Sequence, residues 1–419
     1  MKLKSIELQN FRCYENLRIE LDKSFNIIVG INGTGKTAIL EAARIAIGSL
    51  YSEVDKIENK ISSPSIATDD VRLSNGERQY EVHIKAEAYV SEYIHPSIYK
   101  EEPIIWERTL EKYGGNTKYV NATEIKAVSK IIQRIVRNGE EKNIPLIAYY
   151  STDRYKKEKK NTGLDADGSR LRGYYNSLDA LTNVWFFLNI YKTETLWELQ
   201  QGQKSVLLEV VNKAVMACIN DCARIYHDVK KDELTIELKD NHESIPFHML
   251  SDGVRSTLAM VMEIAFRCFL LNPHLGENAS IETTGIVLID EIDLHLHPAW
   301  QKKIIGDLRT AFPALQFIVS THAPLVIGSL KDGKIFNISE KQAFDFPIQY
   351  GKDANSILNE MHTVEMPDEI KEKIEEYFIL IESGRGKTSK ANELRAELEE
   401  LLGKSHSELQ RADMMLNFF

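Results

Sequence analysis

A glycine-rich segment near the N-terminus has the residue types and the spacing of a loop that holds phosphate groups. It follows an apolar stretch and matches the pattern G-x-x-x-x-G-K-[ST] at every fixed position. Glycines let backbone N–H groups turn inward around a phosphate, and the N-terminus of a following helix adds its positive dipole end. Lys36 is predicted to bridge the β- and γ-phosphates of ATP, and the Thr37 hydroxyl to bind Mg²⁺. The predicted nucleotide contacts are Gly30, Asn32, Gly33, Thr34, Gly35, Lys36 and Thr37.

Two adjacent carboxylates end a strongly apolar segment much later in the chain. Residues 285–289 have the uninterrupted apolar character of a fully buried strand, and Asp290 and Glu291 follow them directly. Ligands bind at the carboxyl ends of strands in open α/β sheets. Asp290 is therefore predicted to hold Mg²⁺ through water. Glu291 is predicted to face the other way and to act as the general base for the attacking water. A solvated acidic strand end is the alternative.

A third apolar run ends in a pair of small hydroxyl residues and a histidine. Ser320, Thr321 and His322 close the strand-like segment 316–321. A histidine at such a place is commonly a capped loop residue. Here it follows Asp290 by 32 residues, which leaves room for one helix and one strand. His322 is therefore expected beside the phosphates, where it can hydrogen-bond the γ-phosphate.

The stretch LSDGV at residues 250–254 interrupts an apolar region just before a helical pattern. Serine and aspartate are ordinary helix N-caps, and glycine is an ordinary turn residue. Taken alone, the stretch predicts only a capped helix start.

Apolar periodicity predicts the elements that position these motifs. Strands are predicted at residues 2–9, 16–22, 24–30, 80–90, 104–110, 145–150, 233–240, 285–291 and 316–321. Helical patterns cover residues 37–51, 126–139, 174–229, 298–312 and most of 353–419. Strands that alternate with helices predict an α/β fold with a mostly parallel sheet.

Composition narrows the protein class. The formal net charge is −10 and no apolar run reaches 18 residues, so neither a membrane span nor a histone-like DNA coat is expected. The four cysteines lack a CxxC pair, which favours core thiols in the cytoplasm, with Cys218 and Cys222 on one face of a helix. The basic stretch 154–172 is either a solvated loop or a contact to the phosphate backbone of DNA.

The order of these motifs resembles that of the ATP-binding-cassette (ABC) ATPases, with LSDGV in the place of the signature. In that family the signature closes over the ATP of a second protomer. The resemblance implies a homodimer that sandwiches two ATP molecules, with nucleotide contacts from Ser251, Asp252 and Gly253. Asp252 and Val254 depart from the usual residues, and such departures are typical of the SMC and RecF-like branch. Larger assemblies than a dimer stay open.

The N-terminal segment 4–14 also resembles the opening of RecF and SMC proteins, which implies that Arg12 lies near the nucleotide. His295 and His297 resemble a segment of standalone SMC-like ATPases. The resemblance favours packing at the dimer interface for this histidine pair over a metal site. The glutamine that usually senses the γ-phosphate is not identified by sequence. Gln79, Gln133 and the segment 149–154 are the candidates.

The segments around 350–369 and 402–406 resemble the tail of the ATPase subunit of Septu anti-phage systems and of retron-linked ATPases. This resemblance implies regulation of a separate HNH nuclease in anti-phage defence. Related nucleases carry a Toprim domain, with clustered carboxylates, after the histidine that corresponds to His322. The 97 residues after His322 contain no DxD cluster, so no nuclease domain is expected in the same chain. A RecF-like DNA-repair clamp and a low-turnover ATP-switched scaffold are the alternatives.

The resulting domain prediction has four parts. Residues 1–153 and 246–345 are the N- and C-terminal lobes of an ABC ATPase head. Residues 154–245 are a helical insertion between the lobes. Residues 346–419 are a helical tail that binds the partner.

Overall fold

The computed structural model describes residues 1–55, 61–96, 101–155, 168–179, 184–219, 222–239, 243–361, 368–403 and 407–418. The chain divides into two compact units, residues 1–357 and 358–419. Each unit has its own core and is described by itself.

The centre of the larger unit is a six-stranded, mostly parallel sheet in the order β16-β15-β3-β14-β13-β9. Only the edge pair β15–β16 is antiparallel. The three central strands are completely buried, as their continuous apolar sequences predict. The strands are β3 (Phe25–Val29), β9 (Leu146–Tyr150), β13 (Gly285–Ile289), β14 (Leu315–Thr321), β15 (Lys334–Ser339) and β16 (Gln342–Phe346). The predicted α/β fold class is confirmed.

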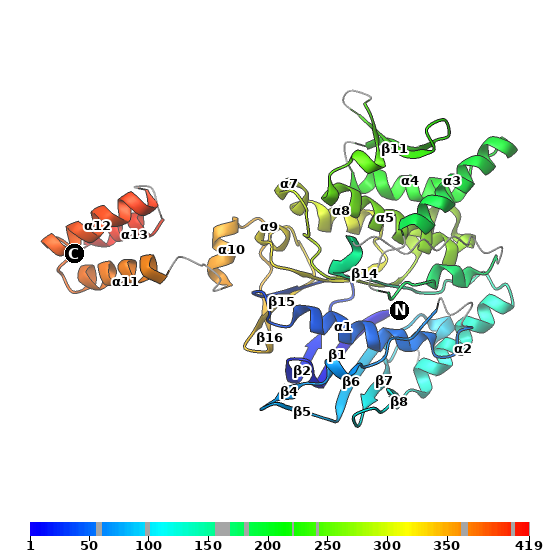
Figure 1. Cartoon of the computed structure of the whole chain (residues 1–419), viewed down its shortest axis with the longest axis horizontal. Coiled ribbons are helices and arrows are strands. Elements are labelled where there is room, and N and C mark those ends of the chain that lie inside the picture. Colours follow the sequence, from blue (N-terminus) through cyan, green and yellow to red (C-terminus); the bar gives the residue numbers. More distant parts are fainter. Residues whose placement is uncertain are drawn as a thin grey trace. The chain divides into compact units, whose positions relative to one another are not determined.

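Helices cover both faces of this sheet (Figure 1). The glycine-rich loop leads into α1 (Lys36–Ile47), which packs on β13 and β14 from one side. The helix α5 (Asp252–Leu271) packs on β9 from the other side, together with α4 (Val206–Cys218) and α8 (Ile304–Ala311). The predicted helix 298–312 is divided at Lys302 and Lys303. The remaining helices of this part are α6 (Ala279–Glu282), α7 (Pro298–Gln301), α8 (Ile304–Ala311) and α9 (Pro324–Ile327).

A second, antiparallel sheet carries the N-terminus and lies on the α1 side of the first sheet (Figure 1). Its strand order is β2-β1-β6-β7-β8. The helix α2 (Thr123–Arg137) packs against β7. The strands are β1 (Lys2–Phe11), β2 (Tyr14–Glu20), β6 (Val82–Tyr89), β7 (Ile104–Leu110) and β8 (Lys118–Val120), and a small hairpin is formed by β4 (Leu73–Ser74) and β5 (Glu77–Arg78).

The insertion contains two helices, α3 (Val184–Gln201) and α4 (Val206–Cys218), and in addition a three-stranded sheet. The strands are β10 (Cys222–Asp228), β11 (Glu233–Leu238) and β12 (Ser244–Pro246). The helical pattern predicted up to residue 229 is therefore wrong after Cys218. The alternating burial of β10 fits a strand, so Cys218 and Cys222 do not share a helix face. Both thiols are buried, which raises the pKa of each; that of Cys222 reaches about 11.

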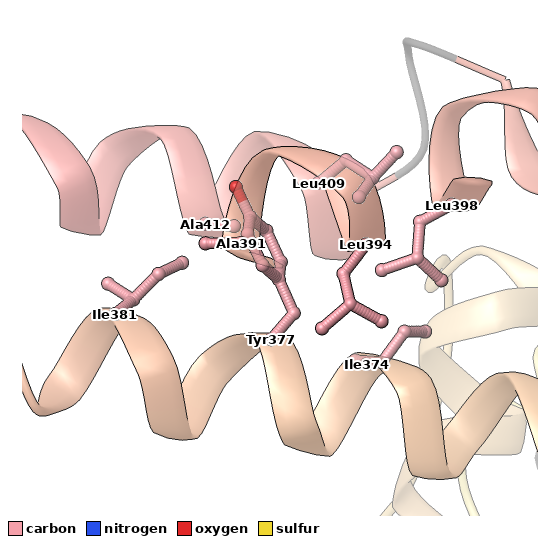
Figure 2. Close-up of a cluster of buried hydrophobic side chains, with 8 residues drawn as sticks. All are labelled: Ile374, Tyr377, Ile381, Ala391, Leu394, Leu398, Leu409 and Ala412. Carbon is pink, nitrogen blue, oxygen red and sulfur yellow. The ribbon is translucent and has the colours of Figure 1, made fainter. Parts of the chain in front are cut away.

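The smaller unit packs three helices around one apolar cluster. Figure 2 shows side chains of all three helices pointing toward one another. The helices are α11 (Asp368–Glu382), α12 (Ser389–Leu402) and α13 (Ser407–Phe418), and α10 (Ala354–Glu360) precedes them. The buried residues are Ile374, Tyr377, Ile381, Ala391, Leu394, Leu398, Leu409 and Ala412. Such a cluster supplies these helices with a core of their own. Within the described residues, no helix is long and apolar enough to cross a membrane.

Candidate nucleotide-binding site

The glycine-rich loop connects the buried strand β3 to α1, and its backbone requires glycine at the two places where space or φ is most restricted. Gly35 has a φ of +106°, and a Cβ atom there would lie 2.5 Å from the Cys13 sulfur. Gly30 has a φ of +154°, and its Cβ would lie 2.8 Å from the carbonyl oxygen of Ile338. Glycine alone fits both conditions. The Tyr14 hydroxyl donates to the Thr34 carbonyl at 3.3 Å, which ties β2 to the loop.

The Lys36 side chain folds back into this loop. Its ammonium donates hydrogen bonds to the carbonyl oxygens of Gly30 and Ile31, at 2.8 and 3.0 Å. Burial lowers the pKa of Lys36, and the negative charges of Glu291, Asp290 and Asp293 oppose that shift. A buried ammonium gains most from an anionic partner. The loop thus holds one positive charge at the place where the sequence predicts phosphate groups.

Asp290 lies at the centre of a hydrogen-bond network that joins three segments of the chain. The Thr37 hydroxyl donates to Asp290 Oδ2 at 2.9 Å, although the two residues are 253 positions apart. The Ser320 hydroxyl donates to Asp290 Oδ1 at 2.5 Å and accepts the Glu291 N–H at 2.8 Å. The structure therefore brings Thr37, Asp290 and Glu291 together.

The backbone at Glu291 is in the left-handed region, with a φ of +47°. This conformation is uncommon for a residue other than glycine and persists where the surroundings fix it. The bond from its N–H to Ser320 is one such constraint. Asp290 is only 1% exposed, whereas Glu291 is half-buried. The two adjacent carboxylates therefore differ in their access to solvent.

His322 follows β14 and lies next to Asp293, a carboxylate that the sequence motifs do not predict at the site. Asp293 Oδ2 lies 3.7 Å from His322 Nε2, and its other oxygen accepts a short hydrogen bond from the Thr321 hydroxyl. Asp293 is buried, while the His322 side chain is 50% exposed. In the sequence, only the position of Asp293 three residues after Asp290 indicates that it lies at the site. We call Lys36, Thr37, Asp290, Glu291, Asp293 and Ser320 the polar edge.

Arg12 lies between two carboxylates near α1. Its Nε donates to Asp70 Oδ1 at 2.8 Å, and one terminal nitrogen lies 4.0 Å from Glu41 Oε2. Glu41 also accepts the Tyr149 hydroxyl at 2.8 Å. The Arg12 side chain remains 33% exposed. This arrangement fixes the guanidinium beside the helix that begins at Lys36, and a nucleotide contact of Arg12 stays a prediction.

The signature residues Ser251, Asp252 and Gly253 form the start of α5 rather than part of the polar edge. Ser251 and Asp252 are exposed, and Asp252 pairs with Arg255 at 2.5 Å. Gly253 is buried against the loop that follows Glu291, since a Cβ atom at position 253 would lie 2.1 Å from the His295 carbonyl oxygen. Only glycine permits this backbone approach. The signature is thus in direct contact with the loop that follows Asp290 and Glu291.

The paired histidines of that loop have different roles in the structure. His295 provides the carbonyl beside Gly253, and its φ is +61°. His297 caps α7, because its Nδ1 accepts the Ala299 N–H at 3.3 Å. Among the residues that the structure describes, no group of three or more histidine, cysteine or acidic side chains could hold a metal ion.

Of the candidates for a γ-phosphate sensor, only the segment 149–154 reaches the polar edge. The Tyr150 carbonyl, at the end of β9, accepts the Asp290 N–H at 2.8 Å. Gln133 is committed to Asp55, from which its carbonyl oxygen accepts the backbone N–H at 2.9 Å. Gln79 donates to the Glu77 carbonyl in the β4–β5 hairpin.

The basic stretch 154–172 lies mostly outside the described residues, since positions 156–167 are not among them. Arg170 is described and is used internally. Its guanidinium donates to the carbonyls of Leu271, Glu140 and Lys142 at 2.6 to 2.7 Å. Arg170 thus stabilises the fold and is not a free cation for DNA.

Comparisons with known proteins identify the family of the chain. A family described as "AAA domain" matches residues 5–215, and one described as "AAA ATPase domain" matches residues 198–327. The Retron Vc95 probable ATPase of Vibrio cholerae serotype O1 biovar El Tor is 26% identical, over 94% of this chain and 86% of that protein. The Septu protein PtuA of Bacillus mycoides (strain KBAB4) is 25% identical over 90% of this chain and 47% of its own length. The resemblance to retron and Septu ATPases is confirmed.

Among solved structures, an Smc head bound to the C-winged helix domain of ScpA aligns with a TM-score of 0.48 and 16% identity. The alignment covers 83% of this chain and 97% of that one.

Proposed function

Because the chain belongs to the AAA domain family of ATPases, we propose that it binds Mg²⁺-ATP at the polar edge and hydrolyses it. The observation that carries this proposal is the 2.9 Å bond between Thr37 and Asp290, together with the buried ammonium of Lys36 in the same loop. A hydroxyl and a carboxylate are oxygen donors of the kind that Mg²⁺ prefers, and the ammonium suits phosphate. The residues present therefore fit both ligands.

The residues at and beside the polar edge then have the following tasks. Backbone N–H groups of residues 30–37 and the Lys36 ammonium neutralise the phosphate charge. Thr37 and Asp290 would hold Mg²⁺, and the ion would neutralise charge on the phosphates. Glu291 takes the proton of the water that attacks the γ-phosphorus, while the bond to the β,γ-bridging oxygen breaks and ADP leaves. His322, oriented by Asp293, donates to the γ-phosphate.

Two variants test the assignment. Glu291→Gln should keep ATP binding and lose multiple-turnover phosphate release, because the general base is gone while the phosphate loop is intact. Lys36→Ala should lose ATP affinity. Binding measured by calorimetry and phosphate release measured under the same conditions separate the two effects. Full turnover by Glu291→Gln would contradict the proposed base.

We further propose that two chains sandwich two ATP molecules through their signatures. The support is the exposure of Ser251 and Asp252 at the start of α5, beside the loop that follows the catalytic carboxylates. An isologous contact of this kind would bury both signatures at once. ATP would then stabilise the dimer by mass action, and hydrolysis would release it.

Light scattering of the Glu291→Gln chain tests this dimer. The mass should double when ATP is added, and Ser251→Arg should abolish the doubling. Ser389→Arg is the matched control, since Ser389 is also an exposed serine in the first turn of a helix but lies in the smaller unit. A monomeric mass with ATP would contradict the sandwich.

The effector under ATP control is, we propose, a separate HNH nuclease in anti-phage defence, held by the smaller unit. The similarity to retron and Septu proteins supports the setting. The separate core of residues 358–419 supports a docking module. Co-purification from the native operon tests the partner. Leu398→Lys should release it, because Leu398 is fully buried in the core of this unit, and Leu398→Met should not, because it keeps an apolar side chain of similar volume there. Purification of the chain alone, without a nuclease, would contradict this reading.

A further inference from the structure

The larger unit has a surface hollow of about 580 Å³ that the proposed function does not use. Its wall contains Lys302 and Lys303 between α7 and α8, Lys331 after α9, and Lys352 on the segment that precedes α10. We call it the lysine hollow. We propose that it binds a compact polyphosphate anion, a small molecule with two or more phosphate groups, and that this ligand regulates ATP hydrolysis.

The charge of the hollow is opposite to that of the chain. The formal net charge of the protein is −10, yet four lysines face one cavity that has a single acidic side chain, Asp307. Lys302 and Lys303 are exposed, and within the described residues neither forms an ion pair. Lysine ammonium groups bind phosphate as point charges. Several of them in one hollow attract an anion of several charges far more than a singly charged one.

The shape of the hollow favours a compact ligand. Gly306 and Gly351 line it without side chains, and a Cβ atom at either position would meet no heavy atom within 4 Å. Tyr350 is 54% exposed at the rim, and the Lys331 ammonium lies 5.2 Å from the centre of its ring. The phenol thus offers a hydroxyl donor next to a cation. The volume is within the range of sites for small molecules.

The location of the hollow connects it to the segment that follows Glu291 and to the segment that follows His322. The helix α9 begins two residues after His322, and Leu325 of α9 lines the hollow. The helix α7 begins directly after His297, on the loop that follows Glu291, and Lys302 follows α7. Helices α7 and α9 are also in contact. A ligand that draws these segments together would shift the loops that hold Glu291 and His322. This regulatory step rests on the proposed ATPase function, whereas binding does not.

Calorimetry with inorganic tripolyphosphate on the full chain tests binding. The Lys36→Ala background removes the competing affinity of the phosphate loop. In that background, Lys302→Gln with Lys303→Gln should weaken binding about tenfold, roughly 1.4 kcal/mol. Lys302→Arg with Lys303→Arg should retain it, because the charge is kept. The control Lys230→Gln with Lys231→Gln removes another exposed adjacent pair and should stay within twofold. Absence of binding, or equal weakening by both glutamine pairs, would overturn the site.

Two further measurements identify the class of molecule that supplies the phosphate groups and test whether the ligand regulates ATP hydrolysis. A single-stranded oligonucleotide that binds more tightly than tripolyphosphate, through the same lysines, would overturn the compact ligand in favour of a nucleic-acid backbone. Tripolyphosphate should also change kcat at saturating ATP with Mg²⁺ in excess, and the glutamine pair at 302 and 303 should lose that response. A kcat that does not respond overturns the regulation. A wild-type chain without any ATP turnover instead refutes the proposed function, and the binding result stands separately.

Discussion

The polar edge and the lysine hollow are opposite in composition and in construction. The polar edge gathers three carboxylates around one lysine, and the hollow gathers four lysines around one carboxylate. At the polar edge the charged groups are mostly buried and are fixed by hydrogen bonds from three chain segments. In the hollow the four lysines are exposed. A preformed network suits chemistry at a defined geometry, whereas exposed lysines suit recognition of charge.

Each region contains one group of opposite charge, Lys36 at the polar edge and Asp307 in the lysine hollow, and burial disfavours the charged form of both. Burial lowers the pKa of Lys36, and nearby carboxylates oppose the shift. Burial raises the pKa of Asp307 to about 6, and Lys303 opposes the shift. Desolvation disfavours the charged form of either residue type. The two regions therefore differ less in this physical effect than in how tightly the surrounding groups are held.

Replacing one aspartate by asparagine in each region should show the difference between the two regions most clearly. Asp290→Asn removes the charge that Thr37 and Ser320 surround and should lower kcat by about a hundredfold or more, at least ~2.7 kcal/mol in activation free energy. Asp307→Asn, measured without added polyphosphate, should change kcat by less than about twofold, because Asp307 has no contact with the polar edge among its described interactions. Phosphate-release kinetics at saturating ATP check both. Comparable losses in the two variants would remove the distinction between the regions.

A second pair of variants compares one hydroxyl in each region. Ser320→Ala deletes the donor to Asp290 and the acceptor of the Glu291 N–H, and both groups are then left without that partner. We expect a loss of about 1–3 kcal/mol in unfolding free energy and a fall in kcat of roughly tenfold. Ser329 lines the hollow and donates only to the Val326 carbonyl from a half-buried position. Ser329→Ala should cost about 0.5 kcal/mol or less. Urea denaturation of both variants measures the two losses in unfolding free energy. Equal losses would argue against a preformed network at Ser320.

The sequence predicted the parts of the polar edge that follow from local pattern. The glycine-rich loop and the apolar strand before Asp290 are continuous segments, and parallel strands place their carboxyl ends at one sheet edge. That rule was sufficient to expect Thr37 and Asp290 together. The same rule predicted the α/β fold, because strands and helices alternate along the chain.

Contacts between distant segments were not predictable. Asp293 is recognisable only once Thr321 and His322 lie beside it. The need for glycine at 253 comes from the His295 carbonyl, a backbone contact that leaves no pattern in the sequence. The sequence predicts helix over the strand β10, because its apolar residues continue the pattern of α4. The lysine hollow joins three separate segments, each of which reads as ordinary surface.

The last prediction concerns the stability contributed by Asp307. A carboxyl whose pKa is raised to about 6 in the folded state binds a proton more tightly there than in the unfolded chain, where its pKa is about 4. The folded state is therefore favoured by protonation. This contribution is fully present below about pH 4 and is lost as the pH rises through about 6.

Asp307→Asn removes this titration, so the variant should become more stable than the wild type as the pH increases from 4 to 6, with a constant difference above that range. The full shift would correspond to about 3 kcal/mol, but the side chain is half-buried and solvent screens it, so we expect about 1 kcal/mol. Urea denaturation at pH 4, 5, 6 and 7 measures the difference. A difference between Asp307→Asn and wild type that does not change with pH would mean that Asp307 is solvated like an ordinary surface carboxylate. The lysine hollow would then be shallower than its residues indicate.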